Sequence, residues 1–273
     1  MLLAPLDGFT DIAFRRLCLE RGAEYAYTEM ISAEGFTRGT QATLKKAYIE
    51  KMENCGLQLF GSRPEQFKKA IEKLETVDNY AKSIDLNIGC PVHKVMKIGA
   101  GSALLSKPKT IEKILNMLSE SSLPVSIKIR LGIEKMQWPE IIKVANKFDL
   151  QHVTVHLRTA IQMYSGKANY GELEKVVSLS NNPIIANGDV KNKDDYETLI
   201  QMGAKNVMIG RTALSNPYIF QWKQKTKDNA VKMIKEYEKL AHTSDCLDEA
   251  QFKRIKMKLL TGFEGAKDMR IHL

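Results

Sequence analysis

Basic and imidazole side chains alternate with apolar residues in two short segments of the chain. In Val125–Arg130, Val and Ile share one side, so that Lys128 and Arg130 share the other. In His152–His156 the same alternation places His156 last on the polar side. A lysine and a histidine so placed could bind an anion or transfer protons, and the lysine could form a Schiff base. Taken alone, each is more typical of a core ion pair or a hydrogen-bonded core histidine.

Three further segments carry polar residues in the same alternation. Gln58 stands between two leucines, Asp85 and Asn87 alternate with Ile and Leu, and Asn187 follows a short apolar run directly. Because residues two apart in a strand point to the same side, all these groups could face one space. Five polar segments facing together favour a functional site over five unrelated structural contacts.

Two glycine-containing turns indicate where an anion could bind. Asn187-Gly188-Asp189 and Gly210-Arg211 each follow an apolar run, and each provides a glycine and a helix start. Backbone N–H groups at such turns bind phosphate, and Arg211 adds a fixed positive charge. Either turn alone is a weak signal, since glycine turns end many strands.

One cysteine stands in a setting that differs from that of the others. Cys90 lies between Gly89 and Pro91, which fix a sharp turn, and Lys94 follows shortly after. A lone cysteine is more often a small buried apolar residue, but this turn would present its thiol to a pocket. We expect the remaining cysteines to be structural: Cys18, Cys55 and Cys246.

The elements that carry these residues are eight short apolar segments, and helical patterns separate most of them. Eight strands that alternate with helices predict an α/β fold, a (β/α)8 TIM barrel. A doubly wound sheet would normally show a Gly-rich turn after its first strand, and none is present. The predicted strands are Leu2–Ala4, Tyr25–Met30, Gly56–Phe60, Ile84–Gly89, Val125–Leu131, His152–His156, Pro183–Asn187 and Asn206–Gly210.

Helical periodicity is clearest after Ser62-Arg63-Pro64-Glu65, which has capping-box spacing, and after a possible Asn192 cap. The segment Thr37–Lys51 is weakly patterned and is taken as helix. Strand signals stop after residue 217, so we expect a barrel over 1–218 and a small helical domain over 219–273. This second part has 12 basic against 8 acidic residues.

The composition is that of a folded protein with an anionic partner. The 273 residues carry a net charge of +9, 44% are hydrophobic and 27% are charged. These values exclude a disordered tail and a fibrous repeat. No apolar run reaches the roughly 18 residues of a membrane span, and the scattered cysteines suggest neither a disulfide framework nor a metal site. We expect a cytoplasmic protein without a membrane or metal partner.

The ordered motifs resemble those of the tRNA-dihydrouridine synthases from residue 2 to about residue 220. The motifs are Ala4–Asp11, Gln58–Gly61, Asp85–Pro91, Gly99–Leu105, Lys128–Gly132, Asn187–Asp189 and Asn216–Phe220. The resemblance implies an FMN-dependent barrel with a C-terminal tRNA-binding helical domain, which uses NADPH to reduce uridines of tRNA. It departs from the family at Leu6, where Met is common, and at Ala160, where Arg is usual.

The resemblance also implies roles for individual residues. Cys90 would be the proton donor for the uracil ring. The residues implied to hold FMN are Ala4, Pro5, Leu6, Gln58, Lys128, His156, Asn187, Gly188, Asp189, Gly210 and Arg211. Those implied to lie near the uracil or the RNA backbone are Asn87, Lys94, Arg158 and Thr159. The basic run Lys253–Lys258 is expected to contact tRNA phosphates, and a monomer is expected.

Other functions remain open at this point. A phosphosugar aldolase would use the same phosphate site with Lys128 as the Schiff-base nucleophile, which leaves Cys90 without a role. A dihydroorotate-type dehydrogenase would share the flavin barrel but would not need a basic helical tail. A non-catalytic RNA-binding protein would explain the charge but not five converging polar segments.

Overall fold

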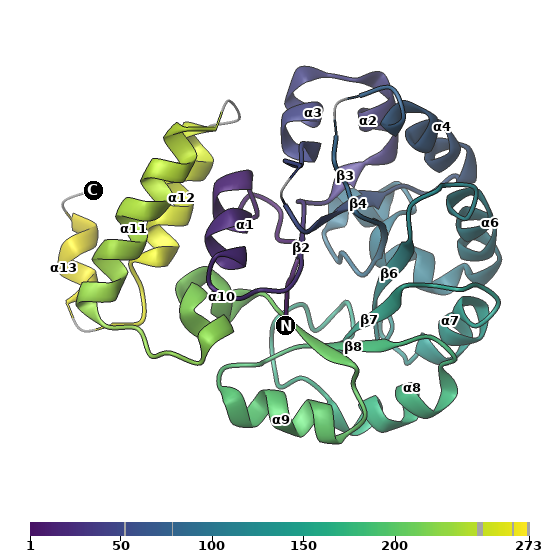
Figure 1. Cartoon of the computed structure of the whole chain (residues 1–273). Coiled ribbons are helices and arrows are strands. Elements are labelled where there is room, and N and C mark those ends of the chain that lie inside the picture. Colours follow the sequence, from purple (N-terminus) through teal and green to yellow (C-terminus); the bar gives the residue numbers. More distant parts are fainter. Residues whose placement is uncertain (52, 78, 245–247, 264, 272–273) are drawn as a thin grey trace.

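The computed structural model describes residues 1–271 except 52, 78, 245–247 and 264. Its strands lie parallel in the order β1-β9-β8-β7-β6-β5-β4-β2, and β3 pairs with β4 (Figure 1). The strands are β1 (Leu2–Leu3), β2 (Ala26–Tyr27), β3 (Ile31–Ser32), β4 (Cys55–Phe60), β5 (Ile84–Ile88), β6 (Val125–Arg130), β7 (His152–His156), β8 (Ile184–Asn187) and β9 (Asn206–Ile209).

The ends of this sheet meet, so the strands form a nearly closed barrel. Leu2 forms a parallel bridge with Tyr25, and the Leu3 N–H donates to the Tyr25 carbonyl at 2.8 Å. On the other side of β1, Leu2 and Leu3 pair with Met208 and Ile209 of β9. The predicted (β/α)8 barrel is therefore confirmed, and all eight predicted strands overlap an observed one.

The second predicted strand, Tyr25–Met30, is wrong in its extent. Only Ala26–Tyr27 pairs with β4 as β2, and the separate strand β3 pairs further along. Between them, the Gln58 N–H donates to the Thr28 hydroxyl at 3.1 Å instead of to a backbone carbonyl. This side-chain contact interrupts the ladder, which alternation of apolar residues could not reveal.

Helices surround the barrel between successive strands (Figure 1). They are α1 (Ile12–Leu19), α2 (Ala33–Arg38), α3 (Gln41–Ala47), α4 (Pro64–Leu74), α5 (His93–Lys97), α6 (Pro108–Leu118), α7 (Trp138–Ala145), α8 (Leu173–Leu179), α9 (Lys193–Gln201) and α10 (Arg211–Ser215). The 3-10 turns are η1 (Gly101–Ser106), η2 (Tyr170–Glu172) and η3 (Pro217–Gln221). The weakly patterned stretch Thr37–Lys51 contains the end of α2 and all of α3, and the two helices are separate because Gly39 takes a left-handed conformation at φ 67°.

Two predicted helix starts have different outcomes. The Asn192 cap is confirmed, since its side chain accepts the Asp195 N–H at 2.9 Å. The Ser62 to Glu65 capping box is wrong by one residue. Arg63 is the N-cap, and the Gln66 side chain accepts the N–H groups of both Ser62 and Arg63.

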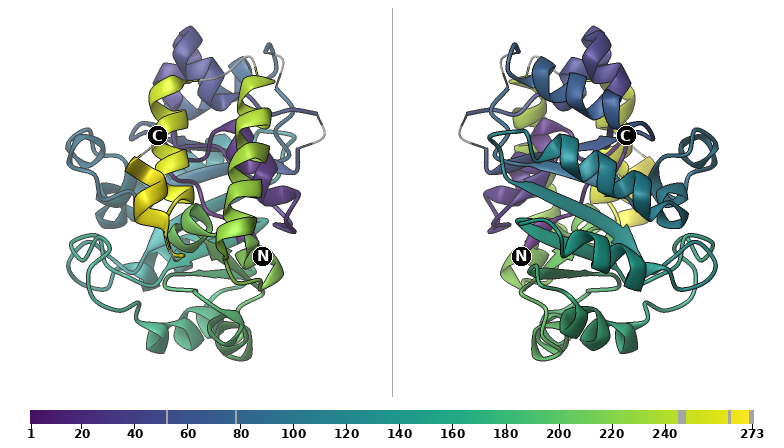
Figure 2. Two further views of the ribbon diagram at one scale, coloured as in Figure 1. Left: turned by 90° about the vertical axis from the view of Figure 1, so that its left-hand side faces the viewer. Right: turned by 90° about the vertical axis from the view of Figure 1, so that its right-hand side faces the viewer.

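Three helices follow the barrel: α11 (Lys227–His242), α12 (Glu249–Leu259) and α13 (Ala266–Ile271). Helices α11 and α12 run side by side against the barrel near α1 and α10 (Figure 2). Tyr237 of α11 is fully buried, and its hydroxyl donates to Asp11 at 2.8 Å. Asp11 also caps α1 by accepting the Phe14 N–H, so this carboxylate joins the last helices to the first.

Candidate active site

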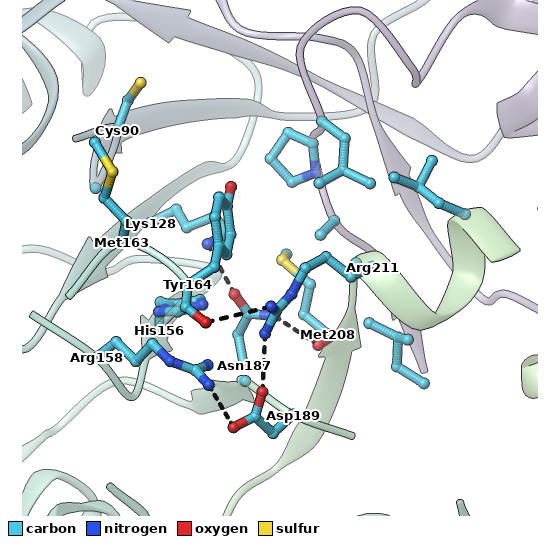
Figure 3. Close-up of a pocket in the computed structure, with 18 of the residues that line it drawn as sticks. Cys90, Lys128, His156, Arg158, Met163, Tyr164, Asn187, Asp189, Met208 and Arg211 are labelled. Carbon is cyan, nitrogen blue, oxygen red and sulfur yellow. Dashed lines mark hydrogen bonds and ion pairs between the residues drawn. The ribbon is translucent and has the colours of Figure 1, made fainter. Parts of the chain in front are cut away.

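A pocket of about 1090 Å³ opens at the carboxyl ends of the strands (Figure 3). In a barrel this is the end where active sites form, because the loops that follow all strands meet there. Most of the residues that the sequence predicted line this pocket: Ala4, Pro5, Leu6, Gln58, Asn87, Cys90, Lys128, His156, Arg158, Asn187, Gly188, Asp189, Gly210 and Arg211.

Lys128 lies at the floor of the pocket, where a hydrogen-bond chain fixes its position. Its Nζ donates to Asn187 Oδ1 at 3.0 Å, and Asn187 Nδ2 donates to the Met208 carbonyl at 2.8 Å. Burial and the nearby Arg130 charge lower the pKa of Lys128 to about 8. The ammonium is thus a positive charge in a poorly solvated place, where it interacts strongly with an anionic ligand.

His156 lies beside Lys128 and is a neutral imidazole. Burial, followed by the charges of Lys128 and Arg130, lowers the pKa of His156 well below its usual value. Its Nδ1 is buried and has no hydrogen-bond partner in the described part of the protein. An unpaired buried nitrogen is costly, so this atom fits a ligand that fills the pocket.

Two arginines meet one carboxylate at the opposite end of the pocket from Cys90 (Figure 3). Asp189 accepts from Arg158 Nη2 at 2.5 Å and from Arg211 Nη2 at 2.9 Å. Two positive charges against one negative charge leave this end cationic. Nη1 of Arg158 is buried without a partner among the described residues, so this end also has a free donor.

This position changes the role of Arg158. The resemblance implied that it lies near the uracil or the RNA backbone, but the side chain is only 1% exposed. It donates to the carbonyls of Ser165 and Gly166 as well as to Asp189. Arg158 therefore belongs to the cationic end of the pocket, and burial prevents contact with an RNA strand at the surface.

The two predicted glycines bring backbone close to this end. Gly188 has φ 137°, a conformation that L side chains rarely adopt, and a Cβ there would lie 3.0 Å from Ala168 Cβ. A Cβ on Gly210 would lie 3.4 Å from Ala4 Cβ and 3.5 Å from Leu6 Cδ2. Both glycines thus allow close packing against Ala168, Ala4 and Leu6, and both line the pocket beside Arg211.

Cys90 lies in a tight turn, and its backbone atoms are all held. Its N–H donates to Asn87 Oδ1 at 2.9 Å, and its carbonyl accepts the Ser102 N–H at 3.0 Å. The side chain is partly exposed to the pocket. Burial raises the pKa of the Cys90 thiol, and the Asp7 carboxylate raises it further. The group is therefore a protonated thiol at neutral pH, able to donate a proton.

Two predicted residues lie outside the pocket lining. Lys94 is exposed on α5, the helix that follows the Cys90 turn. Thr159 is buried, and its N–H and hydroxyl both donate to Gln162 Oε1, at 2.8 and 3.2 Å. Thr159 therefore shapes the loop after β7 and does not face a ligand. Of the other cysteines, Cys18 and Cys55 are fully buried as expected, and Cys246 lies outside the described residues.

Tyr164 lines the pocket although no site role was predicted for it. Its ring lies 4.9 Å from the Arg211 guanidinium, 5.7 Å from that of Arg130, and edge-on to His156 at 6.4 Å. Arg130 was expected to point inward but was given no role. It holds the loops together by donating to the carbonyls of Gly89, Thr159 and Met163. An aromatic residue in a loop carries no periodic signal, so only the structure reveals Tyr164.

The basic run Lys253–Lys258 divides between structural and exposed residues. Arg254 donates to the Gly8 carbonyl at 3.3 Å, and Lys256 pairs with Glu238 at 2.6 Å. Lys253 is exposed, and Lys258 lines the pocket. Two of the four charges therefore also hold α12 in place, and the contact of this run with tRNA phosphates stays a prediction.

A buried carboxylate joins α12 to the loop after β1. Glu29 accepts the Gly8 N–H at 2.7 Å, Lys46 Nζ at 3.1 Å and Gln251 Nε2 at 2.5 Å. Since the same loop supplies Asp7 to the pocket lining, α12 forms part of the pocket's surroundings.

In the described residues, no helix is both long and apolar enough to cross a bilayer, and no cluster of three acidic, histidine or cysteine side chains could hold a metal.

Comparison with known proteins agrees with this geometry. The "Dihydrouridine synthase (Dus)" family model matches residues 2–269. A "Probable tRNA-dihydrouridine synthase" of Aquifex aeolicus is 32% identical, over all of this chain and 90% of that protein. "tRNA-dihydrouridine synthase B" of Pasteurella multocida is 36% identical, over 81% of this chain and 68% of that protein.

Solved structures show the same fold at low identity. Morphinone reductase has a TM-score of 0.57 at 12% identity, covering 81% of this chain and 84% of its own. A structure titled "TcOYE with pHBA" has a TM-score of 0.59 at 10% identity, covering 81% and 87%. A barrel shared with these enzymes, a pocket at its carboxyl end, and a family match over nearly the whole sequence together show that this chain belongs to the dihydrouridine synthase family.

Proposed function

We propose that this protein is a tRNA-dihydrouridine synthase, which reduces the C5–C6 double bond of uridines in tRNA with FMN and NADPH. The observation that carries the proposal is the arrangement of one pocket. A protonated thiol lies at one end, two arginines lie at the other, and Lys128 and His156 lie between them. Family membership assigns this arrangement to uridine reduction.

The lining residues fit FMN. Two buried atoms without partners among the described residues, His156 Nδ1 and Arg158 Nη1, would be satisfied by a polar ligand, and Arg211 beside the glycine turns would bind its phosphate. Lys128 and His156 would face the electron-rich edge of the ring system, and backbone of Ala4–Leu6 would pack against it. The remaining contacts would come from Gln58, Asn187, Gly188, Asp189 and Gly210.

Held by these residues and reduced by NADPH, FMN would supply hydride chemistry toward C6 of the uracil. Cys90 would supply the proton for C5. Its raised pKa keeps the thiol protonated near neutrality, yet a developing enolate is basic enough to take the proton. Asn87 holds the Cys90 turn because its Oδ1 accepts the Cys90 N–H. Lys128 stays charged below about pH 8 and stabilises negative charge during the transfer.

The target base must leave its stack to reach this pocket. Unstacking costs a few kcal/mol in other base-flipping enzymes. Phosphate contacts from exposed lysines near the mouth would offset this cost, from Lys94 on one side and from Lys253 and Lys258 of α12 on another. We propose that residues 219–273 form the tRNA-binding domain, and that the protein works as a cytoplasmic monomer.

The lowered pKa of Lys128 would also suit the Schiff-base lysine of a phosphosugar aldolase. Uridine reduction is favoured because it gives Cys90, which lines the same pocket, a role, and because the family model matches. The test is an absorbance scan of the purified protein, followed by incubation with tRNA and NADPH and analysis of the nucleosides. A flavin band and formation of dihydrouridine are expected. Folded protein that neither shows nor takes up flavin would refute the proposal.

A further inference from the structure

Asp85 is a buried acid for which the chemistry above has no role. It is the second residue of β5, is 1% exposed, and does not line the pocket. Burial raises its pKa to about 6, so at neutral pH it is mainly ionised. Its two oxygens accept from Ser126 Oγ at 2.6 Å and from Gln58 Nε2 at 2.7 Å.

The carboxylate determines which way the Gln58 side chain faces. An ionised carboxylate can only accept hydrogen bonds, so the NH₂ group of Gln58 must point to Asp85. Its Oε1 then points the other way, where it accepts Asn87 Nδ2 at 2.9 Å. Gln58 is 1% exposed, so no solvent is present to stabilise the reversed amide.

The same reasoning determines the orientation of Asn87. With its NH₂ group committed to Gln58, Oδ1 faces the turn after β5. There it accepts the N–H groups of Gly89 at 3.1 Å and Cys90 at 2.9 Å. A reversed Asn87 would place donors against donors at the turn. The Asp85 carboxylate thus fixes the orientation of the Gln58 amide, and Gln58 fixes that of Asn87. Asn87 in turn holds the backbone N–H of Cys90.

We infer that Asp85 is a positioning residue, which holds the Cys90 turn in its reactive geometry through Gln58 and Asn87. The inference rests on the proposed proton transfer by Cys90. Without a fixed acceptor at Asp85, both orientations of each amide become accessible. The Asn87 acceptor is then present only part of the time, and the thiol no longer keeps one position toward the pocket.

Substitutions at Asp85 separate this role from simple core packing. Asp85→Ala removes the acceptor. Asp85→Asn keeps the side-chain volume but not the fixed polarity, because the new amide can present either its oxygen or its NH₂ group to Gln58. Ser126→Ala is the matched control, since it removes the other buried hydrogen bond of Asp85 and leaves Gln58 oriented. Asp85→Ser also lacks a carboxylate, and it replaces Asp85→Ala if that variant does not fold.

Two measurements are made on flavin-loaded full-length protein. One is the single-turnover oxidation of prereduced enzyme by unmodified tRNA, with flavin reduction by NADPH measured separately. For Asp85→Ala we expect tRNA-dependent oxidation to slow by roughly 10- to 100-fold, the usual loss on removing an outer hydrogen-bond partner at metal sites. Flavin reduction should slow by much less, because Gln58 is the member of the proposed FMN-holding set that donates a hydrogen bond to Asp85. Asp85→Asn should slow tRNA-dependent oxidation by less than Asp85→Ala, and Ser126→Ala should remain within about threefold of the parent in both steps, far less than that loss.

The second measurement is the alkylation rate of Cys90 by iodoacetamide, read by mass spectrometry of its peptide. It should change in Asp85→Ala, change less in Asp85→Asn, and stay at the parental value in Ser126→Ala. A parental oxidation rate in Asp85→Ala, or equal slowing in Ser126→Ala, would overturn the inference. Cys90→Ala is run in parallel: if it reoxidises at the parental rate, the proton-donor role itself fails, whatever Asp85 does.

Discussion

Replacing Cys90 by alanine tests the central step of the proposed chemistry. The Cys90 N–H donates to Asn87 and its carbonyl accepts from Ser102, and both hydrogen bonds use backbone atoms that remain in the variant. The turn should therefore persist, although the contact of the thiol with the Val92 backbone is lost. Removing one partly exposed sulfur should lower the free energy of unfolding by about 1 kcal/mol, at the low end for core truncations.

The expected kinetic effect is much larger than the effect on stability. Loss of one positioned general acid slows a step by roughly 10²–10⁴-fold. At about 1.4 kcal/mol for each factor of ten, this corresponds to a barrier higher by about 3–5 kcal/mol. Only the step that moves a proton to uracil should slow. FMN binding and flavin reduction by NADPH should match the parent, because neither uses the thiol.

The assay is single-turnover oxidation of prereduced enzyme mixed with unmodified tRNA, followed at the flavin absorbance band. Cys18→Ala serves as the control, since Cys18 is a fully buried residue of α1 and does not line the pocket. This control should lose stability and keep its oxidation rate. If Cys90→Ala reoxidises at the parental rate while dihydrouridine forms, the proton comes from water or another group and the reasoning fails.

Other properties of the site can be tested separately. Affinity for FMN should weaken as pH rises through about 8, because Lys128 then loses its positive charge. Lys128→Met should bind FMN weakly at every pH and show no change near pH 8, and fluorescence titration measures both affinities. Gly210→Val should fill the space beside the phosphate and raise the Kd for FMN at least tenfold by equilibrium titration, which corresponds to about 1.4 kcal/mol; an unchanged Kd would place the phosphate elsewhere. Lys253→Glu should weaken tRNA binding and reduce its salt dependence in a filter-binding assay without loss of flavin, and equal salt slopes would remove it from the RNA surface. Glu53→Gln should cost about 3–5 kcal/mol in urea unfolding, since it leaves the buried Arg15 without its ion-pair partner at 2.6 Å; a loss below about 1 kcal/mol would contradict this.

The barrel and most of its site could be predicted from the sequence because both follow from local rules. A strand alternates its faces with period two, so Lys128 and His156 were placed inward by their neighbours alone. Parallel strands end at one rim, which brought the Cys90 turn and the Arg211 turn to the same mouth. Fourteen of the sixteen predicted site residues line the observed pocket, as these rules require.

Contacts between distant segments could not be predicted in this way. Arg158 follows a strand end as a ligand residue would, yet Asp189 and two carbonyls of its own loop bury it. Lys253–Lys258 reads as one basic surface, yet Arg254 reaches Gly8 from the other end of the chain. Charge and spacing along the sequence are the same for a free cation and a paired one.

The sequence by itself therefore determined the strand and helix order, the inward residues and the family, since these depend on residue type and near-neighbour spacing. Only the tertiary structure decided the partner of each polar group. The orientation of Gln58 and Asn87 depends on Asp85 and Ser126, from two other points of the barrel. Whether an amide presents its donor or its acceptor to a neighbour depends on the group that faces it across the barrel, and only the folded structure brings those groups together.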